Sequence, residues 1–174
     1  MDRATLVLGI DPGTAITGYG IVRCERQALE HVTYGVITTS ADWPLPLRLQ
    51  HLYRELRTLI GKHNPTEAAV EQLFFARNVR TALSVGHARG VILLAVADAG
   101  LSSHTYTPLQ VKKAITGYGR ATKEQMQQMV RLLLRLESPP QPDDAADALG
   151  VAICHAHSAS LAARLSNGER VAGE

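Results

Sequence analysis

The chain has few of the residues that mark secreted or membrane proteins. Its 174 residues include only two cysteines, Cys24 and Cys154, which is too few for a disulfide framework. We interpret both thiols as buried, small apolar side chains in a reducing compartment. The longest apolar run, at 91–97, is too short to span a bilayer, and the first residues do not have the pattern of a signal peptide. We therefore expect a cytoplasmic protein.

Acidic charge is scarce in the middle third of the chain. From Ala76 to Leu136 there are nine Lys or Arg residues but only two acids, whereas the whole chain has a net charge of +2. This imbalance favours a polyanionic partner such as nucleic acid, although a solvated basic surface would have the same pattern. The length and composition are typical of one domain, which we place at 1–158. Residues 159–174 are small and polar, and we expect them to form a disordered tail.

Hydrophobic patterning predicts an α/β fold with one mixed sheet. Five strands are expected, the first three forming a meander: 4–10, 16–24, 29–39, 67–71 and 103–107. Four helices are expected between and after the later strands: 45–61, 78–99, 122–136 and 144–158. Asn64-Pro65 is a stop signal for the first helix, and Thr122 is a candidate N-cap for the third.

Two acids stand where predicted strands end. Asp11 follows the first strand, and Glu71 ends the fourth. If these strands are parallel neighbours, both carboxylates emerge at the edge of the sheet where ligands of open α/β folds bind. Either acid alone is more commonly a turn or cap residue.

Three more acids are crowded into the stretch PPQPDDAADALG at 139–150. Asp143 is a candidate N-cap of the last helix, and Asp144 and Asp147 share one face of that helix. All three could simply complement the helix dipole, a common use of acids in a first turn. That alternative explains Asp147 less well, because the following residues are nearly all apolar and a charge there needs a cation or a strong partner.

Four acids gathered in one place would repel one another. Carboxylates about 4 Å apart repel by several kcal/mol at an effective dielectric of about 20. Divalent cations relieve this repulsion, and sites with oxygen ligands alone favour Mg²⁺ or Mn²⁺ over zinc. Two such ions can activate water and stabilise the leaving oxygen at a phosphodiester, and the basic middle third could bind the phosphates.

Five ordered segments resemble the RuvC-type Holliday junction resolvases: LGIDPGTAITGYGIV, AVEQLFFARN, GHARGV, QVKKAITGYGRATKEQMQQMV and DAADALGVAI. The resemblance runs from Leu6 to about His157. It implies an RNase H-like fold with helices on both faces of the sheet. It also implies a homodimer that makes paired, symmetric nicks in four-way DNA junctions during homologous recombination and DNA repair. A branch-migration complex of the RuvA and RuvB type is the implied protein partner.

The resemblance also implies residue roles. The metal-binding acids would be Asp11, Glu71, Asp144 and Asp147, holding two Mg²⁺ or Mn²⁺ ions. Lys112 and Lys123 match basic residues near the scissile phosphate, and Phe74 matches an aromatic that stacks on a base. The DNA-contacting residues we expect are Phe74, Arg77, Arg80, Lys112, Lys113, Arg120 and Lys123. The loop before DAADAL carries one residue more than the family pattern, so Asp143 could cap the helix or compete for metal, and we favour capping.

Other residues have structural interpretations. The smooth face formed by Ala82, Gly86 and Gly90 could pack within the chain, but the resemblance favours a dimer contact. Phe75 could be a second stacking residue, but we favour a place in the core. His87 and Arg89 could pack on the sheet or face DNA, and we favour the structural role. Tyr118 is expected to be exposed, with a DNA contact as the alternative, and we expect His155 and His157 to be ordinary helix-end residues.

Three other functions remain open. The segment GIDPGTAITGYG also resembles the first phosphate loop of actin-like sugar kinases and ATPases, but the chain lacks their second phosphate motif and second lobe. A DNA-binding module without catalysis would not need all four acids in register. A general RNase H-like nuclease could cut linear duplex with the same four acids.

Overall fold

The computed structural model describes residues 4–26, 28–72 and 79–171, without the side chains of 79–81 and 161–171. Five strands form one sheet: β1 (Thr5–Asp11), β2 (Ile16–Glu25), β3 (Ala28–Thr38), β4 (Glu67–Glu71) and β5 (Ser102–Tyr106). Their order in the sheet is β3-β2-β1-β4-β5. The first three strands are an antiparallel meander, and β1, β4 and β5 run parallel. The predicted mixed five-stranded sheet is therefore confirmed.

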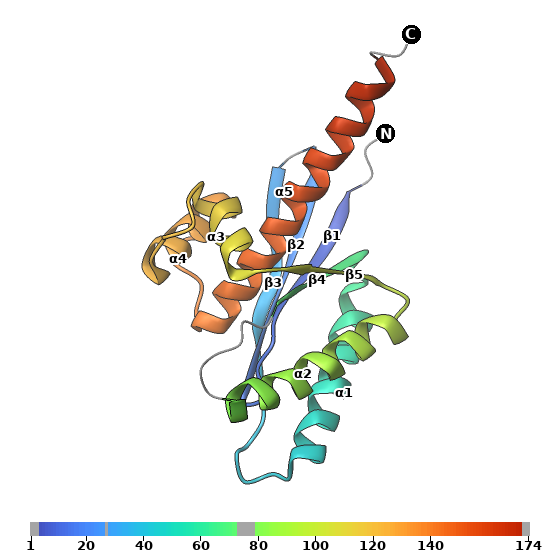
Figure 1. Cartoon of the computed structure of the whole chain (residues 1–174), viewed down its shortest axis with the longest axis vertical. Coiled ribbons are helices and arrows are strands. Elements are labelled where there is room, and N and C mark those ends of the chain that lie inside the picture. The colour runs from blue at the N-terminus through green and yellow to red at the C-terminus, as the bar shows by residue number, and fades with distance from the viewer. Residues whose placement is uncertain (1–3, 27, 73–78, 172–174) are drawn as a thin grey trace.

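Helices cover both faces of this sheet, as predicted (Figure 1). On one face lie α1 (Leu45–His63) and α2 (Val79–Asp98), and on the other lie α3 (Pro108–Thr116), α4 (Lys123–Leu133) and α5 (Asp143–Val171). The ends of two helices follow the sequence signals. Asn64 takes the left-handed conformation after α1, and Thr122 forms a capping box with Gln125 at the start of α4. The described helices include none long and apolar enough to cross a membrane.

The side chains of β1 point alternately to the two faces of the sheet, and each face carries its own core cluster. Val7 packs in the cluster on the α5 face, whereas Leu8 and Ile10 pack with α1 and α2. Because successive side chains of a strand point to opposite faces, Asp11 faces the same side as Val7. The alternation therefore aims the last residue of β1 towards α5.

Two helix predictions need correction. No helix is predicted at 108–115, but α3 begins at Pro108. Thr107 and Gln110 form a capping box at its start, and Gly117 takes the left-handed conformation at its end. The predicted helix end at Ser158 is also wrong, because α5 continues to Val171 and projects beyond the sheet (Figure 1). The division into a domain at 1–158 and a tail at 159–174 stays a prediction.

The two cysteines differ in burial. Cys154 is fully buried in the cluster on the α5 face, as expected. Cys24 is only half-buried at the end of β2, so the expectation of burial is wrong for this residue.

Candidate active site

Asp11 and Glu71 lie side by side at one edge of the sheet. Ile10 pairs with Val70 in the parallel register of β1 and β4, so the next residue of each strand is one of the two acids. Both side chains face α5 by alternation. The two carboxyl groups share a hydrogen bond. The sequence prediction that these two acids meet at a strand edge is therefore correct in geometry.

Glycines in the sheet let α5 approach closely enough to add two more acids. A Cβ at Gly18 would collide with the backbone carbonyl of Asp144, and one at Gly9 would collide with the carbonyl of Ala148. Only glycine leaves room for the helix backbone at these two positions. The first turns of α5 consequently rest directly on β1 and β2, which brings Asp144 and Asp147 next to the strand-end acids.

The four acids are close enough for their charges to act on one another. Burial, the neighbouring Glu71 charge and its hydrogen bond, and the charges of Asp147 and Asp144 raise the pKa of Asp11 to about 8. Burial also raises the pKa of Glu71 and of Asp147 above their usual range. Asp11 therefore holds a proton near neutral pH when no cation is bound and donates it to Glu71. A cation that displaces this proton would relieve the repulsion.

Lys123 reaches this group from the start of α4. Its ammonium nitrogen lies 3.0 Å from Asp143 Oδ2 and 3.7 Å from Asp147 Oδ2. Asp143 also accepts a hydrogen bond of 2.8 Å from the side-chain amide of Gln127. The predicted capping role of Asp143 is wrong, because α5 begins at Asp143 and the carbonyl of Pro142 accepts the first helical hydrogen bonds. The carboxylate of Asp143 instead holds Lys123.

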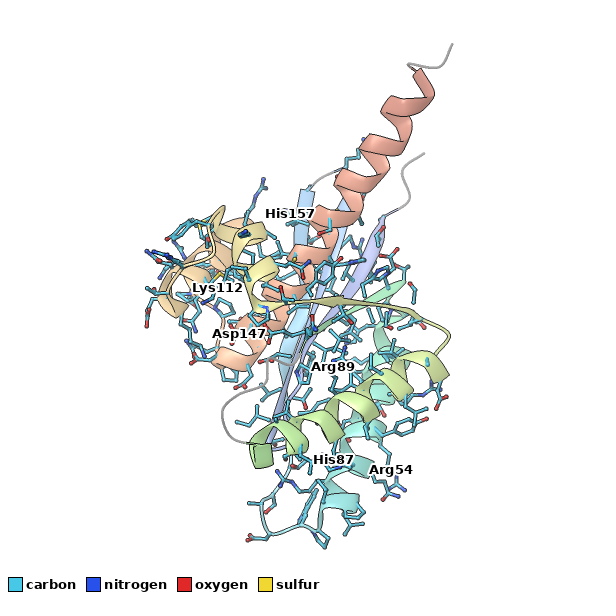
Figure 2. All side chains as sticks on the ribbon, in the orientation of Figure 1. Arg54, His87, Arg89, Lys112, Asp147 and His157 are labelled. Atoms are coloured by element: carbon cyan, nitrogen blue, oxygen red, sulfur yellow. The ribbon has the colours of Figure 1, made fainter. Side chains whose placement is uncertain are left out.

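Lys112 approaches the acids from α3, the helix that sequence patterning missed. The capping box at Thr107 starts this helix directly behind β5, and Lys112 lies half-buried on it. The positive charge of Lys112 acts on Glu71 and opposes the rise in the pKa of that carboxyl. Figure 2 shows Lys112 on α3 and Asp147 on the neighbouring helix α5. Two lysines on two helices thus border the four acids.

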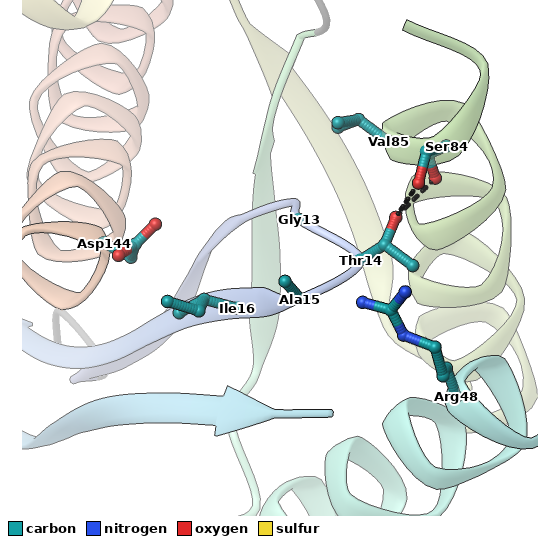
Figure 3. Close-up of a pocket in the computed structure, with 8 residues that line it drawn as sticks. All are labelled: Gly13, Thr14, Ala15, Ile16, Arg48, Ser84, Val85 and Asp144. Carbon is teal, nitrogen blue, oxygen red and sulfur yellow. Dashed lines mark hydrogen bonds between the residues drawn. The ribbon is translucent and has the colours of Figure 1, made fainter. Parts of the chain in front are cut away.

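A pocket of about 480 Å³ opens beside Asp144 (Figure 3). It is lined by Gly13, Thr14, Ala15, Ile16, Arg48, Ser84, Val85 and Asp144. The turn that forms its floor is held in place, because Thr14 Oγ1 donates to the carbonyl of Ser84 at 2.7 Å and Thr39 Oγ1 donates to the carbonyl of Thr14 at 2.6 Å. The pocket thus lies between Asp144 on α5 and Ser84 and Val85 on α2, with Arg48 in its wall.

The other predicted DNA contacts are only partly described. Phe74, Phe75 and Arg77 lie outside the described residues, as does the side chain of Arg80. Lys113 and Arg120 are both exposed, on α3 and on the loop after it. Their roles stay predictions.

Of the remaining candidates, Tyr118 is exposed as expected, and its hydroxyl donates to Gln125 at 2.9 Å. Arg89 donates to Thr105 on β5 at 3.2 Å, which supports its structural interpretation, whereas His87 is exposed on α2 (Figure 2). The interpretation of His155 as an ordinary helix-end residue is wrong. It is buried within α5 and contacts β4 and β5.

Sequence reasoning also missed a group of side chains that could hold a metal ion: Glu67, His104 and His155. The period of two along β4 and β5 could have placed two of these side chains on one face of the sheet. Glu67 lies four residues before Glu71 on the same face of β4, and His104 lies two residues before Tyr106 on the same face of β5. The pairing of His155 with these strands could not be read from the sequence, because it depends on how α5 crosses the sheet.

An open mixed sheet with acids at the ends of two parallel strands, two more acids on a crossing helix and lysines around them has the architecture of an RNase H-like nuclease. The family model for the crossover junction endodeoxyribonuclease RuvC matches residues 7–155 of the chain. The chain belongs to this family. The enzyme class and the RNase H-like fold class expected from the sequence are thereby confirmed.

Relatives support the family over nearly the whole length. A crossover junction endodeoxyribonuclease RuvC of Heliobacterium modesticaldum is 58% identical over 153 residues, which cover 88% of this chain and 94% of that protein. The structure of Thermus thermophilus RuvC in complex with Holliday junction substrate aligns with a TM-score of 0.86 and 35% identity, covering 91% of this chain and 96% of that one. The yeast mitochondrial Holliday junction resolvase, at 17% identity and a TM-score of 0.66, shares the fold.

Proposed function

We propose that the chain cuts four-way DNA junctions by metal-dependent hydrolysis of phosphodiester bonds, in paired symmetric nicks, during homologous recombination and DNA repair. The observation that carries this proposal is the convergence of Asp11 and Glu71 with Asp144 and Asp147 at the sheet edge, bordered by Lys112 and Lys123. A similar protein has been solved with Holliday junction substrate, which favours a junction as the substrate here.

The donor set fits hard divalent cations. All four acids offer carboxylate oxygens, the ligands that such cations prefer. Burial, together with the charges of the other three acids and the hydrogen bond with Glu71, raises the pKa of Asp11 to about 8, so the group holds a proton that a divalent cation would displace. We propose Asp11, Glu71, Asp144 and Asp147 as the ligands of two Mg²⁺ or Mn²⁺ ions. Such ions, when bound, activate a water molecule and stabilise the leaving oxygen.

The chain's own residues would position the scissile phosphate. Lys123, which forms an ion pair with Asp143, and Lys112, whose charge acts on Glu71, present positive charges next to the acids. Positive charges placed where negative charge develops lower the barrier to phosphoryl transfer. The pocket beside Asp144, with Arg48 in its wall, lies next to this point and would receive the DNA backbone.

The DNA surface would extend over the basic middle third. We propose backbone or base contacts for Phe74, Arg77, Arg80, Lys112, Lys113, Arg120 and Lys123. The exposure of Lys113 and Arg120 is consistent with phosphate contacts. Phe74 would stack on a base at the junction centre.

We also propose that the protein acts as a homodimer through α2. Gly90 on this helix has no neighbouring atoms within 4 Å of where a Cβ would lie. Leu83 and Leu94 lie on the same outer stripe and are 62% and 54% exposed. The outer stripe of Leu83, Gly90 and Leu94 is therefore exposed on the described part of this chain. A second copy would cover it and place two active sites on one junction. We propose further that the protein works with a branch-migration complex of the RuvA and RuvB type and is located in the cytoplasm.

Two rival functions differ in measurable ways. A general nuclease would cut linear duplex as well as junctions, and a binding module would bind junctions without cutting them. Labelled mobile four-way junction and matched linear duplex should be compared with wild type and Asp144→Asn, in EDTA, Mg²⁺ or Mn²⁺. We expect paired symmetric nicks on the junction alone, lost in EDTA. The variant should lose at least about a hundredfold in rate, since even outer-shell changes at metal sites cost 10–100-fold.

Junction binding by Asp144→Asn should persist, because the phosphate contacts remain. Equal cutting of linear duplex would favour the general nuclease. If the wild type binds the junction tightly but cuts no DNA with either metal, the protein is a DNA-binding module without catalysis.

A further inference from the structure

A second cluster of potential metal ligands lies at the other end of β4 from the four acids. Glu67 begins β4, His104 lies in the middle of β5, and His155 lies on α5. One ligand atom from each side chain lies within 4.8 Å of the other two. Glu67 and Glu71 are the first and last residues of β4, roughly 13 Å apart along the strand. The cluster is therefore separate from the candidate active site.

The register of the sheet explains why these side chains meet. Glu67 and Glu71 face α5 because they alternate with Ala68 and Val70, which are buried on the opposite face. In the parallel pair of β4 and β5, His104 lies beside Ala69. His104 consequently points to the same face as Glu67, where α5 crosses the two strands.

His155 is held in the orientation that a metal ligand needs. Its side chain is only 3% exposed, its Nδ1 lies 2.8 Å from the hydroxyl oxygen of Tyr106, and its Nε2 hydrogen bonds with Glu67. Because the carboxylate of Glu67 accepts, Nε2 carries the proton of this hydrogen bond, and Nδ1 accepts from the hydroxyl of Tyr106. A cation that displaced the Nε2 proton would bind there, and His155 would then donate from Nδ1 to Tyr106. Metal-binding histidines usually have such an outer partner on the second ring nitrogen.

His104 supplies the open side of the cluster. Its ring centroid lies 4.4 Å from that of His155, with 31° between the ring planes. Unlike His155, His104 is exposed on the edge strand, so its ring can rotate and an ion can enter from solvent. A tetrahedral site with metal–nitrogen bonds of about 2.0 Å has ligand atoms about 3.3 Å apart, which these side chains reach by a small rotation.

We propose that Glu67, His104 and His155 bind one zinc-like divalent cation, with water as the fourth ligand. Two imidazoles and one carboxylate form a donor set typical of zinc, whereas Mg²⁺ prefers oxygen ligands alone. The two sites of the chain would thus take different ions. Because the three ligands come from β4, β5 and α5, the bound ion would fasten the edge strand to the sheet and to the helix that carries Asp144 and Asp147.

The proposal is tested by adding Zn²⁺ or Co²⁺ to the full chain in excess Mg²⁺, which occupies the carboxylate site. We expect one Zn²⁺ per chain by calorimetry, a visible Co²⁺ absorption band from nitrogen ligands, and a rise in Tm, because an ion that binds only the folded state stabilises it. His104→Ala should weaken Zn²⁺ binding at least about a hundredfold and abolish the band. Tyr106→Phe should weaken binding by about 10–100-fold through the loss of the outer partner.

His157→Ala is the matched control, because His157 is an exposed histidine on the same helix outside the cluster. It should bind Zn²⁺ as the wild type does, and so should Asp147→Asn, which alters only the carboxylate site. The proposal is overturned if the wild type takes up no Zn²⁺ in excess Mg²⁺. It is equally overturned if His104→Ala binds as tightly as His157→Ala, in which case His155 and Glu67 form a hydrogen-bonded pair without metal.

Discussion

The ammonium nitrogen of Lys123 lies 3.0 Å from a carboxylate oxygen of Asp143 and 3.7 Å from one of Asp147. Asp147 belongs to the proposed metal site, but Asp143 does not. Since Lys123 begins α4 and Asp143 begins α5, their contact ties the starts of two helices together beside the four acids. Asp143 therefore positions a residue that we propose to act on the phosphate.

Asp143→Asn should change the pH dependence of cleavage more than its maximum rate. The hydrogen bond from Lys123 to Asp143 is the largest influence that raises the pKa of Lys123. Without it, the lysine loses its proton at lower pH, so the alkaline limb of the pH–rate profile on junction DNA should move to lower pH. The maximum rate should fall by no more than about fivefold, because exposed ion pairs contribute about 1 kcal/mol or less. Glu137→Gln, which removes an exposed acid elsewhere, is the control, and superposed profiles for Asp143→Asn and wild type would contradict the prediction.

Without metal, the protein should lose stability as pH rises from about 4 to 8. The folded-state pKa of Asp11 is raised from 3.8 to about 8, so in this window the folded state holds a proton that the unfolded state has released. Protons bound only by the folded state stabilise it, and this contribution is lost as pH approaches the folded pKa. Thermal unfolding in EDTA should show it.

Asp11→Asn removes this titration. The variant should therefore be more stable than wild type in EDTA at pH 8, and the gap should narrow towards pH 5. Added Mg²⁺ should raise the Tm of wild type at pH 8 and raise that of Asp11→Asn much less. A pH-independent gap between the two proteins would show that burial and charge do not act on Asp11 in this way.

Gly18→Ala should separate the two halves of the active site. The new Cβ would collide with the backbone carbonyl of Asp144, so α5 must move away from β2. We expect a stability loss of about 1–3 kcal/mol, as for other overpacked sites, together with a large loss of junction cleavage. Gly61→Ala on α1 is the matched control, since nothing lies within 4 Å of its Cβ position and alanine favours a helix. The control should be as active as wild type and slightly more stable, and equal behaviour of both variants would contradict the proposed close approach.

The strands and most helices could be predicted because their signals are local. The apolar runs of β1 and β4 predicted that Asp11 and Glu71 would each end a strand, and the parallel register places these two strand ends side by side. The helix α3 was missed although Thr107 and Gln110 carry a capping box, because the helix is short and follows a strand without a break.

The rest depended on contacts between distant elements. The proline before Asp143 provides the carbonyl that starts α5, which frees the carboxylate for Lys123, and no local pattern predicts that partner. The burial of His155 likewise follows from the crossing of α5 over β4 and β5. Local patterns predicted which strand and helix ends carry the acids, whereas the packing of α5 on the sheet determined which residues they contact.

Charge placed on the outer stripe of α2 should break the proposed dimer. Leu83 is 62% exposed on this helix, and a glutamate there would have to lose its hydration if a second copy covers the face. Leu83→Glu should therefore sediment as a monomer at concentrations where wild type is a dimer. Because one monomer brings one active site, the variant should nick a single strand of the junction rather than two symmetric strands.

Leu132→Glu is the matched control for this substitution. Leu132 is 56% exposed, but it lies on α4, away from the proposed contact. The control should remain dimeric and make paired nicks, which separates loss of the dimer from a general effect of negative charge near DNA. A Leu83→Glu variant that stays dimeric and makes paired nicks would place the contact elsewhere, and a monomeric wild type that makes paired nicks would remove the need for it.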